Sequence, residues 1–375
     1  MLKLNNQEKK YFKELEKIEE IYLELSHMTP LGFPKPKNLQ EEKEIFFKKI
    51  NENKIYNPQI KYHLSKHNVL DSDNIKEKIK NIDFLNDLFG LKKLYKKKLE
   101  SRFLQVDYHK FWGTEKSSEF ALKYWSKPNI FLVHKAKKFC KEYSRKVIKF
   151  KRVIPKKVGE ILEEEVEKLT RNSIKVKFVS MASKVNIEAS KGFIEINKDE
   201  SFTSLDVERL KAHEIGVHYM RFFNGAKFGL KLLETGTCGY LETEEGLAAY
   251  NEFDKGVLSK AQIFVYAGRV LATHYCLKKS FYEVFYILKG YGFTNDVAFA
   301  ITFRAKRNLS DTSLKGGFTK DYVYFKGFYN VKKFAEKNDV NRLFIGKVSI
   351  NDLRVLKKFI DRFYNDIKSP FEKLN

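Results

Sequence analysis

Two histidines stand five residues apart in this chain, with a glutamate directly after the first, and a regular helix cannot aim both at one point. They are His213, Glu214 and His218, in the segment LKAHEIGVHYMRFF. At about 100° per residue, the two imidazoles would diverge by roughly 140°. A single-turn π-bulge absorbs one extra residue, and such bulges favour functional sites. We therefore predict a widened turn over residues 213–218, where Gly216 supplies a small, flexible position.

A pair of acids, Glu244 and Glu245, follows downstream in the sequence EEGLA. Zinc prefers imidazole nitrogen and carboxylate oxygen, and a catalytic zinc keeps one position for water. The metal lowers the pKa of that water to about 7, and an adjacent carboxylate accepts its proton. We predict His213 and His218 as zinc ligands, with Glu245 as the third. Glu214 is the predicted catalytic base.

The segments HEIGVH and EEGLA together resemble a family of zinc metallopeptidases defined by an HExxxH helix and a (Q/E)EGLA helix. This family includes the microtubule-associated tyrosine carboxypeptidases and bacterial proteins described as flavohemoglobin expression-modulating QEGLA motif proteins. Two further segments are similar to it, GGFTKDYVYFKG at 316–327 and FLNDLFGLKKLYKKKLESRF at 84–103. The resemblance implies a zinc carboxypeptidase that removes a C-terminal residue, which is tyrosine from tubulin in the animal members.

The resemblance also implies the ligand and base roles given above, with one ambiguity. Glu244 stands where many bacterial members have glutamine, so the choice between Glu244 and Glu245 as ligand stays open. In gluzincin peptidases an acid four residues after the ligating glutamate orients a histidine, but this chain has Ala249 there. Glu252, one turn further on, could orient a histidine instead, and an exposed salt bridge is the alternative.

A carboxypeptidase must bind the terminal carboxylate of its substrate, and Arg or Lys does this best. It also needs a hydrogen-bond donor for the tetrahedral oxyanion, often Tyr or His. Arg304, Arg307 and Lys320 are the candidates for the carboxylate. Tyr322 and Tyr324 are the candidates for the oxyanion.

The chain has a formal net charge of +24, and its basic residues are unevenly distributed. Residues 101–150 hold 12 Lys or Arg against 4 Asp or Glu, and residues 301–350 hold 11 against 4. Residues 201–250 are slightly acidic, with 5 against 7, and a bound Zn²⁺ would offset this. Such a distribution suits an acidic C-terminal tail as substrate. It also suits nucleic acid, so the alternative is a non-catalytic, metal-containing regulatory or nucleic-acid-binding protein.

Cysteine usage and hydropathy indicate a cytoplasmic protein. The three cysteines, Cys140, Cys238 and Cys276, are scattered and odd in number, which argues for a reducing compartment. Cys238 is a minor candidate ligand because it lies nearest the predicted site. The first residues have no apolar core, so we expect no signal peptide. The apolar run at 261–277 is short for a membrane span and carries Arg269, so we predict a buried helix there.

The predicted fold is α+β and mostly α-helical, with a small zincin-like sheet before the metal-binding helix. Apolar periodicity predicts helices over residues 6–27, 39–52, 72–102, 116–126, 128–144, 157–171, 259–278, 280–290, 294–308, 321–337 and 350–365. The segment 72–102 is expected to be a helical hairpin with a break near Gly90. The alternating segments 174–180 and 192–199 predict strands. We expect residues 192–197 to pair with extended substrate, Thr203 or Ser204 to cap the next helix, and residues 225–241 to form a loop over the site.

Three parts of the chain are expected on this basis. Residues 1–38 comprise an N-terminal helix, whose apolar face should pack on the rest of the chain, and a proline-containing linker. Residues 39–150 form a basic helical subdomain, and residues 151–375 form the zincin-like catalytic domain. A single compact unit over 39–375 is the alternative.

Overall fold

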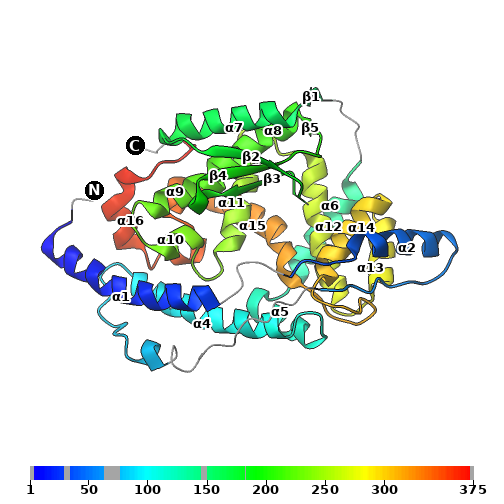
Figure 1. Ribbon diagram of the computed structural model, residues 1–375, viewed down its shortest axis with the longest axis horizontal. Coiled ribbons are helices and arrows are strands. Elements are labelled where there is room, and N and C mark those ends of the chain that lie inside the picture. Colours follow the sequence, from blue (N-terminus) through cyan, green and yellow to red (C-terminus); the bar gives the residue numbers. More distant parts are fainter. Residues whose placement is uncertain (1–3, 29–33, 63–76, 145–149, 182, 372–375) are drawn as a thin grey trace.

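The computed structural model describes residues 4–28, 34–62, 77–144, 150–181 and 183–371. Most of these residues are helical, and the strands among them form a three-stranded sheet and a separate short pair (Figure 1). The protein is therefore α+β and mostly helical, as predicted. The centre of the proposed linker, residues 29–33, lies outside the described residues, and the division into domains stays a prediction.

The first helix, α1 (Asn6–Met28), packs against the rest of the chain, as its apolar face predicts. It lies beside α4 (Leu91–Lys110) and touches α10 (Lys231–Thr235) (Figure 1). Its buried face consists of Tyr11, Leu15, Ile18, Tyr22 and Leu25. This face shares one hydrophobic core with the C-terminal helices.

A buried carboxylate on α1 makes stability depend on pH. Glu19 accepts hydrogen bonds from the Tyr95 hydroxyl and the Lys231 amide. Burial raises the pKa of Glu19 to about 7, against the opposing effect of the Lys231 amide. The pKa of a glutamate in an unfolded chain is about 4.3. Between this pH and about pH 7, the folded chain therefore holds a proton on Glu19 that the unfolded chain releases. Stability is therefore lost as pH rises through this window.

We expect Glu19→Gln to flatten this dependence. Its free energy of unfolding in urea should fall less than that of the unmodified chain between about pH 4.5 and about pH 7. Equal slopes for the two proteins would show that Glu19 does not hold its proton in the folded state.

A second core gathers helices from both halves of the chain. They are α2 (Leu39–Asn51), α6 (Ile130–Glu142), α12 (Lys260–Cys276), α13 (Phe281–Gly290), α14 (Asn295–Lys306) and α15 (Val323–Ala335). Each of these six helices contributes to this core, and Phe46 of α2 is buried against Phe281 and Phe285. The helix α5 (Lys116–Trp125) instead joins a small separate cluster through Ala121. The apolar run at 261–277 is the buried helix α12, as expected. Among the described residues, no helix has both the length and the apolarity to cross a membrane.

Two helix predictions were wrong in extent. The predicted break near Gly90 is confirmed, because α4 begins at Leu91, but residues 81–90 are turns, bends and irregular chain and not the first arm of a helical hairpin. The predicted helix 350–365 is divided into η5 (Ile350–Asp352), α16 (Lys357–Phe363) and η6 (Tyr364–Asp366). Apolar spacing alone does not predict these interruptions, because tertiary packing overrides local propensity.

The sheet confirms both predicted strands and adds a third. β2 (Lys175–Val179) runs parallel to the central strand β4 (Phe193–Asn197), and β3 (Val185–Glu188) runs antiparallel on its other side. The separate pair joins β1 (Arg152–Val153) to β5 (Phe202–Thr203). The expected substrate pairing along residues 192–197 is therefore wrong, because β4 has a hydrogen-bonded strand on each edge.

The sheet leads into the helix that carries the histidines. Thr203 caps α8 (Ser204–Leu210) and forms a capping box with Asp206, which confirms one of the two predicted caps. The inward face of β4 packs with α7 (Pro155–Thr170) and with Ile215 and Tyr219 of the histidine segment. This packing attaches the histidine segment to the sheet.

The predicted loop 225–241 contains the short helix α10. Its Leu232 and Leu233 are buried in the core that α1 shares, and α11 (Tyr240–Asp254) follows. α11 carries the EEGLA sequence and crosses α15 at two glycines. A Cβ on Gly246 would lie 2.3 Å from the carbonyl carbon of Gly327. The close crossing therefore requires glycine and sets the position of Glu245.

Candidate metal centre

The histidine segment is a widened helix. Residues Lys211–Tyr219 form a single π-helical stretch, η2, between α8 and α9 (Met220–Ala226). The ring centroids of His213 and His218 lie 4.8 Å apart, with the ring planes at 83°. The predicted widening is confirmed, and it places both imidazoles on one side of the helix.

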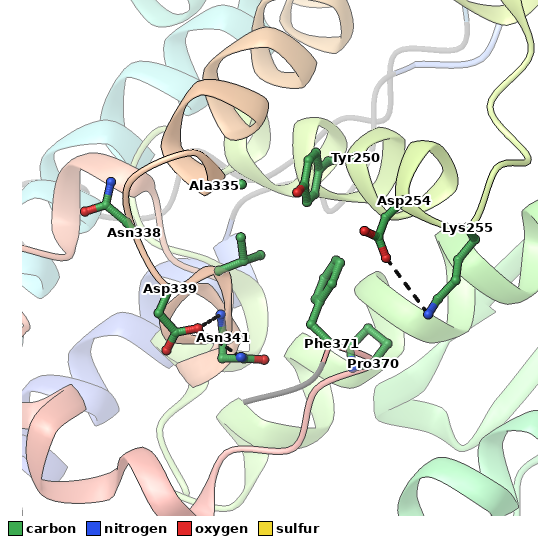
Figure 2. Close-up of a pocket in the computed structure, with 10 residues that line it drawn as sticks. Tyr250, Asp254, Lys255, Ala335, Asn338, Asp339, Asn341, Pro370 and Phe371 are labelled. Atoms are coloured by element: carbon green, nitrogen blue, oxygen red, sulfur yellow. Dashed lines mark hydrogen bonds and ion pairs between the residues drawn. The ribbon is translucent and has the colours of Figure 1, made fainter. Parts of the chain in front are cut away.

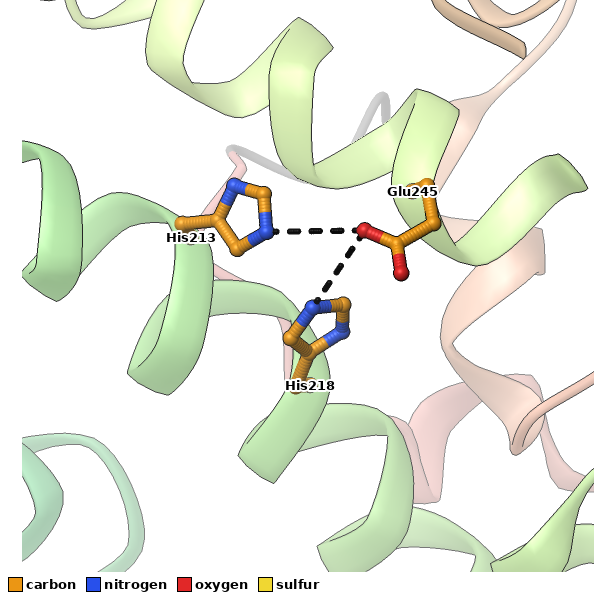
Figure 3. A group of neighbouring side chains, drawn as sticks. All are labelled: His213, His218 and Glu245. Carbon is orange, nitrogen blue, oxygen red and sulfur yellow. Dashed lines mark ion pairs between the residues drawn. The ribbon is translucent and has the colours of Figure 1, made fainter. Parts of the chain in front are cut away.

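Glu245 of α11 faces both imidazoles (Figure 3). Its Oε2 lies 3.7 Å from His213 Nε2 and 3.9 Å from His218 Nε2. The three ligand atoms all lie within 4.8 Å of one another, and this is the group of possible metal ligands found in the described part of the chain. A tetrahedral zinc with bonds of about 2.0–2.2 Å separates its ligand atoms by about 3.3 Å. The three side chains therefore fit such an ion after small torsional adjustments.

The outer nitrogen of each imidazole is held by a buried carboxylate. Glu252 lies 2.7 Å from His213 Nδ1, and Glu244 lies 2.9 Å from His218 Nδ1. Each histidine thus turns its Nε2 toward Glu245, the arrangement that orients histidine ligands in metal sites. Glu252 is fully buried, so the exposed salt bridge considered for it is wrong.

These two carboxylates are themselves anchored by arginines. Arg209 donates from Nε to Glu252 at 2.7 Å. Arg221, which is fully buried, bonds Glu244 and also donates to the carbonyls of residues 343, 346 and 348. The sequence pattern predicted no role for either arginine and considered Glu244 only as a possible ligand. Because Glu244 bonds His218 Nδ1 and Arg221, it faces away from the space between the imidazoles. The geometry therefore favours Glu245 as the ligand.

The buried carboxylates at the centre favour a positive charge between them. Burial alone would raise the pKa of Glu245, but His213, His218 and Lys320 bring it down to about 2. Burial would likewise lower the pKa of His213, yet the neighbouring carboxylates raise it well above its usual range. A divalent ion can replace the imidazolium charge and satisfy the same carboxylates.

Glu214 lies on η2, directly after His213. It lines a pocket of about 140 Å³ together with His213, Glu252 and Lys184. Its side chain is partly exposed, and its negative charge contributes to the raised pKa of His213. Neither His218 nor Glu245 lines this pocket, so the role of Glu214 as base stays a prediction.

The predicted substrate-binding residues form a basic cluster around Asp321. Arg304 pairs with Asp321, and Arg307 lies 3.6 Å from the same carboxylate. The pKa of Asp321 is driven well below its usual range because these arginines outweigh the effect of burial. Burial and Arg307 lower the pKa of Lys320 to about 8, against the opposing charges of Asp321 and Glu245. Lys320 is thus electrostatically coupled to the candidate ligand.

The two candidate tyrosines differ in their surroundings. The hydroxyl of Tyr322 donates to the carbonyl of Trp125 at 2.7 Å, so it is occupied away from Glu245. Burial raises the pKa of Tyr324, and the charge of Glu245 adds to the effect. Arg269 lies over the Tyr324 ring at 4.4 Å and forms no ion pair among the described residues. Arg269 had no role in the sequence-based prediction.

A larger pocket of about 390 Å³ lies elsewhere, between the end of α11 and the C-terminal segment (Figure 2). Tyr250, Asp254, Asp339 and Phe371 line it, with neither histidine of the centre. Cys238 is exposed and does not belong to the group of possible ligands in the described residues. Among the described residues, the group of possible metal ligands is therefore the histidine–glutamate centre, and it lies outside this pocket.

The fold and this centre define a helical protein whose histidine–carboxylate group is suited to one divalent metal ion. The chain belongs to the microtubule-associated tyrosine carboxypeptidase family, whose profile matches residues 44–364. It is 33% identical over 165 residues to human microtubule-associated tyrosine carboxypeptidase 1 and 32% identical to the rat protein, covering 40% of this chain and 33% of each relative. A mouse putative tyrosine carboxypeptidase, MATCAP2, is 32% identical over 163 residues, covering 40% and 30%. The match thus spans about a third of the length of these relatives.

Proposed function

We propose that this protein is a zincin-like, zinc-dependent carboxypeptidase that removes a C-terminal residue, with tyrosine or another aromatic residue preferred, from a peptide or protein. The observation that carries the proposal is the convergence of His213 Nε2, His218 Nε2 and Glu245 Oε2, each within 4.8 Å of the others. The names of the relatives support the reaction and the preferred residue. The described residues add no observation specific to the alternative, a nucleic-acid-binding role.

The site residues divide the work of peptide hydrolysis among them. His213, His218 and Glu245 would hold zinc, which when bound polarises the scissile carbonyl and acidifies the attacking water. Glu214 then accepts the proton of that water and delivers it to the departing amine. Glu252 and Glu244 keep the imidazoles oriented during these transfers, because each holds an Nδ1.

The basic cluster would bind the terminal carboxylate of the substrate. Arg304 and Arg307 are partly neutralised by Asp321. Arg269 forms no ion pair among the described residues, although its charge also lowers the pKa of Asp321. Lys320 is half-buried and electrostatically coupled to Glu245. Together these groups leave a net positive charge beside the centre, and a buried carboxylate would be strongly attracted to it. An acidic substrate tail fits the same field.

The proposal is tested with a peptide that ends in Glu-Tyr and carries a free carboxylate. We expect release of free tyrosine, detected by chromatography, and loss of release after treatment with a chelator, with recovery on adding zinc. The matching C-terminal amide should resist cleavage, because it cannot pair with the basic cluster.

Two variants sharpen this test. Lys320→Met should raise KM about tenfold or more, since a lost charged hydrogen bond costs roughly 1.5–3 kcal/mol. Lys315→Met, a substitution on the exposed loop before Gly316, serves as the matched control and should leave KM unchanged. Cleavage of the amide at the same rate as the acid would exclude a carboxypeptidase, and zinc-independent cleavage would exclude the metal mechanism.

A further inference from the structure

Asn251 touches the widened turn from the neighbouring helix. Its Nδ2 donates to the carbonyl oxygen of Ala212 at 2.7 Å, and the side chain is 1% exposed. Ala212 directly precedes His213, and Glu252, the next residue after Asn251, holds the ring of His213. α11 therefore contacts both the backbone before this histidine and the imidazole itself.

A π-helical turn is intrinsically less stable than the α-helix that flanks it. Its i→i+5 hydrogen bonds are rare in proteins and occur mainly as short bulges. Departures from regular helix arise where a side chain inserts into the hydrogen-bond ladder. The amide of Asn251 is such a side chain, and its bond to Ala212 gives that carbonyl a partner that a regular α-helix would not need.

Gly216 makes room for this contact. A Cβ at position 216 would lie 2.6 Å from Asn251 Nδ2 and 3.3 Å from the Lys211 carbonyl oxygen. Gly216 does not adopt the left-handed conformation that favours glycine. Its role is therefore to admit the Asn251 amide, and not to supply the backbone flexibility expected from the sequence.

We propose that Asn251 is a positioning residue that keeps the turn of His213 and His218 widened. Without its amide the segment would relax toward a regular α-helix. The extra residue that the π-turn absorbs would then rotate His218 away from His213 by about 100°. Asn251 would thus determine zinc affinity without touching the ion. This inference rests on the proposed function for its zinc readout, but the shape of the helix can be tested without it.

The test measures zinc affinity and helix geometry in Asn251→Ala. We expect the zinc Kd, from competition with a chromophoric chelator, to rise about 10- to 100-fold, as for other groups that orient metal ligands. The visible spectrum of the Co²⁺-substituted protein should change with the ligand geometry. Gly216→Ala should shift both readouts in the same direction, because its methyl group would displace the Asn251 amide.

Asn224→Ala is the matched control. Asn224 is another buried asparagine, which donates to the Lys368 carbonyl at 2.6 Å, outside the turn. We expect it to lower Tm while leaving the zinc Kd and the Co²⁺ spectrum unchanged. A crystal structure of Asn251→Ala should show a regular α-helix at 211–219, and a retained π-turn with an unchanged Kd would overturn the proposal. If the unmodified chain binds no zinc, the proposed function fails, whereas the crystal structure still decides the role of Asn251.

Discussion

Glu214→Gln is expected to lower kcat/KM for a C-terminal tyrosine peptide by about 100- to 10,000-fold, the usual contribution of general acid–base catalysis. The amide keeps the size of the side chain but cannot accept the proton of the attacking water. Because Glu214 is not among the three candidate ligands, zinc content and the Co²⁺ spectrum should remain unchanged. Metal analysis and steady-state kinetics on the same sample measure both effects.

Glu208→Gln controls for the loss of one negative charge near the site. Glu208 lies on the exposed side of the preceding helix, where it pairs with Lys211 at 3.0 Å. We expect nearly full activity in this variant. Full activity in Glu214→Gln would remove Glu214 from the mechanism, and loss of zinc from it would indicate a ligand role instead of a base role.

The adjacent acids Glu244 and Glu245 should respond oppositely to substitution. Glu245→Gln removes the candidate carboxylate ligand, so the zinc Kd should rise by more than the 10- to 100-fold typical of outer groups. Glu244→Gln should change the zinc Kd less but destabilise the fold more. It leaves the fully buried Arg221 without its ionic partner, and breaking a buried pair costs about 3–5 kcal/mol.

Chelator competition and urea denaturation of the two variants separate these effects. The expected pattern is a large change in zinc Kd for Glu245→Gln and a large loss of unfolding free energy for Glu244→Gln. The reverse pattern would identify Glu244 as the ligand and would require Glu245 to be the orienting acid.

Features that depend on residues close together in the sequence could be predicted from the sequence alone. The five-residue spacing of His213 and His218 demanded a widened turn, because helix geometry permits no other way to make the imidazoles converge. Apolar periodicity located most helices and both β2 and β4, since a buried face repeats with the period of its element. The acid pair in EEGLA was also evident, although its two members could not be assigned.

Only the tertiary structure decided which groups surround that turn. Glu252 and Glu244 reach the histidines from α11. Asn251 of the same helix bonds the backbone before His213, and Arg209 and Arg221 anchor the two carboxylates. No local pattern in the sequence predicts these pairings. Likewise β4 became a central strand because the short β3 pairs with its second edge, which excluded substrate pairing there. The spacing of the histidines thus indicated that their helix must widen, while burial and long-range hydrogen bonding determined which carboxylate faces the centre and which ones hold the imidazoles in place.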